Sequence, residues 1–215
     1  MARHNHPLFT RIYGWIARVE DAGAIGRART QVCGELSGRV LIIGLGPGVD
    51  LHHLPPEVTE VVAVEPSVSM RKSAEPEIAA ARARGVSVEL LDAVGEELPL
   101  PDNSVDGVLM AFVLCTIADD RAAIAEARRV LRPNGVLAVL EHVRAADDSW
   151  MGRSQRFLSP IWPYVAGGCH CDRDTRSMLD QAGFDTASVT DTVLVNMMPT
   201  GTAIVGVARP FANRG

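Results

Sequence analysis

The chain has 215 residues, of which 47% are hydrophobic and 22% charged, and its formal net charge is −5. This is the composition of a globular chain that folds without disulfide bonds or structural metal ions. The negative charge argues against nucleic acid as a partner. Four cysteines, no apolar signal-peptide core and no run long enough to cross a bilayer predict a cytoplasmic protein with no membrane anchor.

The first 37 residues are expected to form an N-terminal helical arm or lid on a single domain of residues 1–215. Leu8, Ile12 and Trp15 recur at helical spacing, and arginines outnumber acidic residues in this stretch. We therefore expect one apolar helix face packed on the domain.

Short apolar runs then alternate with helical patterns. The expected strands are residues 39–43, 61–65, 86–91, 105–111 and 136–141, and the expected helices include 67–85, which Ser67 caps, and 119–131. Alternation of strand and helix predicts an α/β fold, with a mostly parallel sheet and helices on both faces.

The alternation stops after residue 142. Residues 146–172 are expected to be an aromatic-rich insertion that borders the acceptor site, with an acceptor wall made of Trp162, Tyr164 and His170. Trp150 and Phe157 are further aromatic candidates for this wall, and plain core packing is the alternative interpretation. A helix at 174–182 and strands at 184–193 and 202–208 complete seven expected strands.

Glycines follow the first expected strand at Gly44, Gly46 and Gly48. Glycine allows a sharp turn and a close approach of the backbone to a ligand. The dinucleotide fingerprint G-x-G-x-x-G does not fit, because its third glycine would fall on Val49. The spacing favours a nucleoside ligand without a pyrophosphate.

Two carboxylates end the next two expected strands. Glu65 lies where an acid accepts hydrogen bonds from both ribose hydroxyls, and Asp92 lies where an acid holds an adenine amino group. Ligands of open α/β sheets bind beyond the carboxyl ends of the strands, so these acids and the glycines predict one crevice. Capping of the following helix or turn is the alternative role for each acid.

With these motifs in order, the sequence resembles the class I S-adenosylmethionine-dependent methyltransferases. Segments 97–106 and 129–135 match the same superfamily. The resemblance implies a Rossmann-like sheet of order 3-2-1-4-5-7-6 with strand 7 antiparallel, and S-adenosylmethionine bound over Gly44–Gly48, with Ala93 and Phe112 also at the donor. One departure is Ile42, where the superfamily usually has an acidic residue.

A narrower resemblance rests on residues 112–117, 140–143 and 168–173. These segments are similar to methyltransferase-like proteins that methylate small thiols, and to bacterial proteins described as phospholipid N-methyltransferases. The resemblance implies a small-molecule acceptor.

Histidine near the rim of the donor crevice suggests how the acceptor is activated. His142 directly follows the fifth expected strand and is the candidate general base, with a structural histidine as the alternative. Glu141, His142 and His170 together are a candidate Mg²⁺ site.

These residues favour O-methylation of a small hydroxyl compound, such as a sugar or glycoside. Thiol S-methylation and phospholipid N-methylation are the alternatives within the superfamily, and an inactive nucleoside-binding module is the alternative outside it. If the chain forms an oligomer, a dimer is expected.

Overall fold

A single mixed sheet organises the protein. The structure, a computed structural model, describes residues 7–194 and 199–211. The strand order is β3-β2-β1-β4-β5-β8-β6, in which β6 is Phe184–Asp185, and β7 (Val189–Val193) pairs with β8 off this path. The parallel strands are β1 (Gly38–Ile43), β2 (Val58–Val64), β3 (Ser87–Leu91), β4 (Val105–Ala111) and β5 (Leu131–His142). The last strand, β8 (Thr202–Pro210), runs antiparallel to β5, so the expected Rossmann-like methyltransferase topology is confirmed.

Both faces of the sheet are buried, as the continuous apolar runs predict. Successive side chains of a strand point to opposite faces. Leu41 and Ile43 of β1 therefore belong to one hydrophobic core, whereas Val40 and Ile42 belong to the other. Ile42 is only 1% exposed, so the residue that replaces the usual acid is part of the core.

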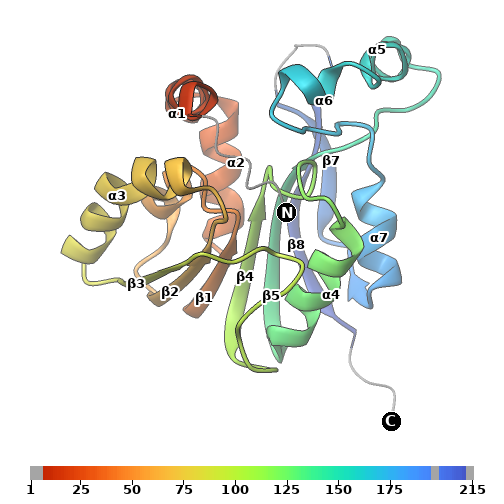
Figure 1. Ribbon diagram of the computed structural model, residues 1–215. Coiled ribbons are helices and arrows are strands. Elements are labelled where there is room, and N and C mark those ends of the chain that lie inside the picture. Colours follow the sequence, from red (N-terminus) through yellow and green to blue (C-terminus); the bar gives the residue numbers. More distant parts are fainter. Residues whose placement is uncertain (1–6, 195–198, 212–215) are drawn as a thin grey trace.

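Helices cover the two faces in pairs (Figure 1). Apolar residues of α2 (Ala24–Cys33) and α3 (Val68–Ala83) pack into the core that holds Ile42. Those of α4 (Asp120–Val130) and α7 (Thr175–Gln181) pack into the other core. The arm begins with α1 (Pro7–Asp21), and the glycine turn leads into the short 3₁₀ helix η1 (Val49–His53).

Helix starts follow the expected capping chemistry. The hydroxyl of Ser67 accepts a hydrogen bond from Met70 N at 3.4 Å, and Asp119 accepts one from Ala122 N at 2.9 Å. Each side chain satisfies a backbone donor that the first turn leaves free.

The strand predicted at residues 184–193 is wrong as one element. It forms two short strands, β6 (Phe184–Asp185) and β7 (Val189–Val193), both paired with β8. Between them, Asp185 Oδ1 accepts a hydrogen bond from Ala187 N at 3.0 Å, and Val189 N donates to Thr186 O at 2.9 Å. This local turn interrupts the ladder, as Asx turns do.

The aromatic-rich insertion contains two short helices, α5 (Trp150–Leu158) and α6 (Trp162–Val165). Figure 1 shows them at the same end of the molecule as α1. Among the described residues, no helix has the length and apolar character needed to pass through a bilayer.

Candidate functional site

The glycine turn connects the end of β1 to η1. Gly44 and Gly48 have φ angles of +72° and +84°, which residues with a side chain rarely adopt. A Cβ on Gly44 would also overlap Cγ2 of Val113, at the end of β4. Glycine is therefore required at position 44 by both the backbone conformation and the neighbouring strand.

Glu65 holds this turn against the start of α3. Its side chain is 7% exposed, and its two oxygens accept hydrogen bonds from Gly46 N and Ser67 N, both at 2.9 Å. Burial raises the pKa of this carboxyl, and the two backbone hydrogen bonds oppose the rise. A carboxylate has about four acceptor positions, so Glu65 retains capacity for ribose hydroxyls.

Asp92 lies one strand further along the same edge. It forms an ion pair with Arg71, in which Nη1 lies 2.9 Å from Oδ1, and the same Arg71 nitrogen donates to the backbone oxygen of Glu65 at 2.7 Å. Arg71, from the first turn of α3, thus bridges the two strand ends that were predicted to form the crevice. Arg71 was not expected at the site from the sequence, because nothing in its local pattern separates it from Arg82 and Arg84 at the other end of the helix.

Phe112 and His142 stack at the ends of β4 and β5. Their ring centroids are 4.6 Å apart, and Phe112 has a φ of +54°, fixed in part by the hydrogen bond from its N to Leu140 O at 2.8 Å. Burial lowers the pKa of His142 to about 4, and Nδ1 has no hydrogen-bond partner among the described residues. His142 is therefore neutral at physiological pH and a weak base, so its role as general base stays a prediction.

Glu141 is fully buried beside this stack. Its Oε1 accepts hydrogen bonds from Val113 N and Leu114 N, both at 2.8 Å, while Oε2 has no partner within the described part of the chain. Burial raises the pKa of Glu141 to about 7, although those backbone hydrogen bonds lower it in part. The carboxyl fixes the loop that follows β4.

The Mg²⁺ site predicted from Glu141, His142 and His170 is not supported. Over residues 7–194 and 199–211, no group of three histidine, cysteine or acidic side chains could hold a metal ion. Glu141 and His142 are successive residues of a strand and point to opposite faces, whereas His170 is exposed on the insertion.

The residues of the expected acceptor wall differ in their exposure, and their role at the acceptor stays a prediction. Trp162 is half-buried and packs on a buried cluster of Cys115, Cys169 and Cys171. Tyr164 is 88% exposed, and His170 is exposed while its backbone N donates to Cys115 O at 2.7 Å. Trp150 and Phe157 are exposed as well. The cysteines thus attach the insertion to the loop after β4, and the aromatic side chains lie mostly on its outer surface.

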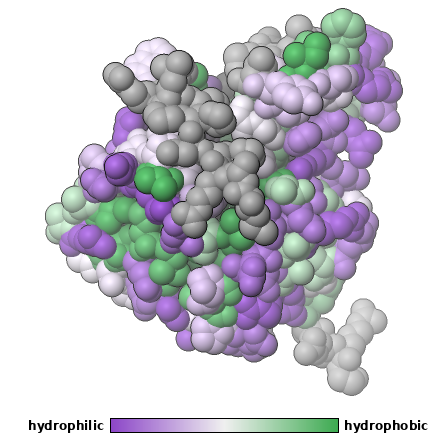
Figure 2. Space-filling model, in the orientation of Figure 1, coloured by the Kyte–Doolittle hydropathy of each residue, from purple (hydrophilic) through white to green (hydrophobic). Residues whose placement is uncertain are grey.

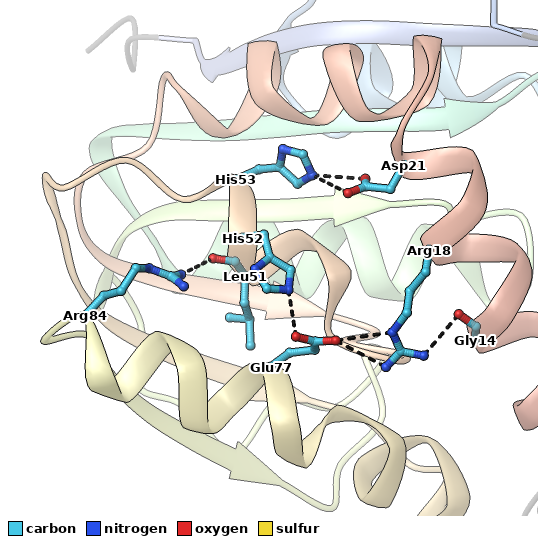
Figure 3. Close-up of polar contacts among 8 residues, drawn as sticks. All are labelled: Gly14, Arg18, Asp21, Leu51, His52, His53, Glu77 and Arg84. Atoms are coloured by element: carbon cyan, nitrogen blue, oxygen red, sulfur yellow. Dashed lines mark hydrogen bonds and ion pairs between the residues drawn. The ribbon is translucent and has the colours of Figure 1, made fainter.

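The N-terminal arm is attached to the glycine turn and α3 by ion pairs (Figure 3). His53 Nε2 lies 3.0 Å from Asp21 Oδ1. The carboxylate of Glu77 in α3 forms two further ion pairs, in which Oε2 lies 2.6 Å from His52 Nε2 and Oε1 lies 3.2 Å from Arg18 Nη2. These contacts join α1 to the residues that follow Gly48.

A second contact of the arm reaches Phe112, which is one of the predicted donor-site residues. Arg29 of α2 is 5% exposed, and its Nη1 lies 2.8 Å from Oδ1 of the buried Asp50. The guanidinium lies 5.5 Å from the ring centroid of Phe112, within the range of a cation–π contact. The sequence alone indicated only a basic arm, because a buried pair whose partners are 21 residues apart leaves no local signal.

Comparison with known proteins gives a consistent result. A family model described as "Methyltransferase domain" matches residues 41–139. Thiol S-methyltransferase TMT1B of Homo sapiens is 32% identical over 80% of this chain and 71% of its own length. The ubiquinone/menaquinone biosynthesis C-methyltransferase UbiE of Syntrophotalea carbinolica is 30% identical over 75% of this chain and 70% of its own. The crystal structure of a SAM-dependent methyltransferase from Thermotoga maritima shares the fold, with a TM-score of 0.66 and 23% identity over 95% of this chain and 99% of its own.

The buried carboxyl of Glu141 predicts a specific pH dependence of stability. Its folded-state pKa of about 7 lies above the ordinary 4.5, so folding takes up a proton between these values and the free energy of unfolding falls as pH rises through this window. Glu141→Gln removes this pH-dependent contribution to the free energy of unfolding, which amounts to about 3 kcal/mol over the whole window.

The measurement is urea unfolding of both proteins on either side of that window. We expect the difference in free energy of unfolding between Glu141→Gln and the parent chain to shift in favour of the variant at the higher pH. Glu89→Gln, on an exposed strand position, is the matched control and should show no such shift. Parallel pH curves for all three proteins would contradict the assignment.

Proposed function

This chain belongs to the class I S-adenosylmethionine-dependent methyltransferases, and we propose that it methylates the thiol of a small acceptor. The observation that carries the proposal is the likeness to thiol S-methyltransferases, at 30% identity or more over about four fifths of the chain. The UbiE relatives are C-methyltransferases, and those of Hahella chejuensis, Paraburkholderia phymatum and Paraburkholderia phytofirmans match over less than half of this chain. The thiol relatives are therefore the better guide to the acceptor.

The donor half of the site is assigned to the carboxyl edge of β1, β2 and β3. Gly44–Gly48 let the backbone approach the donor, Glu65 accepts from the ribose hydroxyls, and Asp92 accepts from the adenine amino group. Ala93 and Phe112 complete this side. The hydrogen bonds that already join Glu65 to Gly46 support this assignment, because they place the carboxylate at the turn before any ligand arrives.

A thiol acceptor suits the weak basicity of His142. The acceptor sulfur forms a bond to the methyl carbon as the carbon–sulfonium bond of the donor breaks, and the thiol proton passes to solvent. A thiol with a pKa near 8.5 is partly ionised at neutral pH and requires little help, whereas a hydroxyl requires a general base. Because burial lowers the pKa of His142 to about 4, the site supports the first acceptor better than the second. In this proposal the protein mainly aligns donor and acceptor.

The hydroxyl acceptor favoured by the sequence alone becomes the second candidate, and a phospholipid amine the third. The sequence relatives named above are a thiol S-methyltransferase and a C-methyltransferase. An inactive nucleoside-binding module would bind the donor without transferring its methyl group.

The assignment of Glu65 predicts weaker donor binding in Glu65→Gln. Loss of charged hydrogen bonds to the ribose should cost roughly 1.5–3 kcal/mol of binding free energy. Isothermal titration calorimetry with S-adenosylmethionine measures this, and the exposed Glu89→Gln is the control. A melting temperature close to that of the parent chain shows that the turn itself has survived. Equal affinity in all three proteins would remove Glu65 from the donor site.

The thiol proposal predicts both acceptor preference and pH dependence. With labelled S-adenosylmethionine, transfer should occur to pools of small thiols rather than to sugars, phenols or phospholipids. The value of kcat/KM should rise with pH and follow the pKa of the thiol used, so that a more acidic thiol shifts the profile to lower pH.

The variant His142→Gln separates the candidates. A general base contributes about 10²–10⁴-fold to a rate, so we expect less than about a tenfold loss of kcat/KM if the thiol ionises by itself. Transfer to a hydroxyl pool, together with a loss of a hundredfold or more in His142→Gln, would overturn the proposal. Donor binding with no transfer to any pool would identify an inactive module.

A further inference from the structure

The insertion exposes an unusual set of apolar side chains. Its two helices present Trp150, Phe157, Ile161 and Tyr164, which are 51%, 83%, 63% and 88% exposed. We name these four side chains the α5–α6 face. Single exposed apolar residues are common on soluble proteins, but a cluster of large ones within one short segment marks a surface that contacts something.

Packing on the inner side of α5 keeps this face outward. Gln155 is 1% exposed; its Oε1 accepts from Ala145 N at 2.8 Å, and its Nε2 lies 3.0 Å from the backbone oxygens of Val143, Cys171 and Pro199. Gly152, also on the inner side, leaves no room for a Cβ against Ala146 O. The orientation of α5 is therefore fixed by a satisfied buried amide, and its aromatic residues do not have an alternative place in the core.

The central part of the insertion, residues 149–171, carries a net positive charge, and Asp147, Asp148 and Asp172 flank it. Residues 149–171 contain no aspartate or glutamate, whereas Arg153 and Arg156 are exposed on α5 between the apolar residues. The chain as a whole carries −5. Cationic and aromatic residues are thus concentrated on one exposed segment.

The α5–α6 face lies at the functional end of the molecule. The insertion follows the carboxyl end of β5, the edge of the sheet that carries Gly44, Glu65 and Phe112. In Figure 2, green hydrophobic residues lie beside purple hydrophilic ones at the upper right, over α5 and α6. Helix α1, at the same end in Figure 1, also exposes Trp15, by 67%.

We propose that the α5–α6 face docks on an anionic phospholipid surface. Tryptophan, tyrosine and phenylalanine side chains enter the headgroup region, and arginines on the same segment pair with lipid phosphates and acidic headgroups. Charge also argues against a second copy of this chain as the occupant. A two-fold dimer through this face would place the arginines of one copy near those of the other. Docking presents the carboxyl edge of the sheet to the membrane, where apolar acceptors concentrate.

Vesicle flotation of the full chain tests the proposal without requiring the acceptor. We expect binding to phosphatidylcholine vesicles that contain phosphatidylserine, weaker binding to pure phosphatidylcholine, and loss of the difference at high salt. Phe157→Ser with Ile161→Ser should lower the ratio of bound to free protein roughly tenfold on both vesicles. Arg153→Gln with Arg156→Gln should lower it about tenfold, on the anionic vesicles only.

Phe211→Ser is the matched control. Phe211 is 53% exposed and follows β8, whose antiparallel direction places it at the opposite end of the sheet from α5. Calorimetry with S-adenosylmethionine checks that every variant is folded. Equal vesicle binding by Phe157→Ser/Ile161→Ser and Phe211→Ser would overturn the proposal, as would no vesicle binding by the parent chain. A dimer in light scattering that Phe157→Ser/Ile161→Ser dissociates would assign the face to a second copy instead. Because lipid binding is read without turnover, its failure is distinguishable from failure of the thiol assay.

Discussion

Burial of both faces of the central parallel strands keeps charged side chains out of the middle of these strands and places them at the strand ends. From Val40 to Ile43 every side chain of β1 enters one of two hydrophobic cores. An ionised group in the middle of such a strand would lose its hydration without a partner, at a cost of several kcal/mol. The acids therefore appear where the strands end, as Glu65 and Asp92 do. The crevice is a direct consequence of the layered fold, since parallel strands end side by side.

Glu141 is an exception to this placement of acids beyond the strand ends, and its hydrogen bonds explain how the carboxyl edge is stabilised. It lies inside β5 rather than beyond it and has no exposed surface. Two backbone N–H groups of the loop after β4 compensate part of its desolvation, and the residual penalty remains as a pKa near 7. Its two hydrogen bonds fix the backbone after Phe112. The carboxyl thus stabilises the turn in which Phe112 has a positive φ and stacks on His142, at the junction of donor and acceptor sides.

Much of the fold and the donor side could be predicted because their signals are local. The apolar runs fix the strands, Ser67 caps its helix, and the spacing of Gly44, Glu65 and Asp92 reflects strand ends that must meet. The acceptor side could not be predicted, since its features join residues far apart in sequence. Whether Tyr164 faces a ligand or solvent depends on Gln155, whose partners lie up to 44 residues away. The split of the strand at 184–193 depends on a competing side-chain turn at Asp185, which periodicity does not report.

The N-terminal helices α1 and α2 and the insertion are attached to the rest of the fold by different kinds of contact. Helix α1 is held by the Arg18–Glu77 pair, in which Arg18 is 44% exposed, and by the Asp21–His53 pair, whose side chains are 20% and 13% exposed. Exposed pairs such as Arg18–Glu77 contribute about 0–1 kcal/mol each. In contrast, the Arg29–Asp50 pair of α2 is buried, and removal of one partner would leave an uncompensated charge in the core. The insertion is likewise held by the buried amide of Gln155 and by the cysteine cluster. The Arg18–Glu77 pair therefore requires much less free energy to open than the Arg29–Asp50 pair of α2. The lid role expected of residues 1–37 stays a prediction, whereas apolar residues of α2 belong to the hydrophobic core.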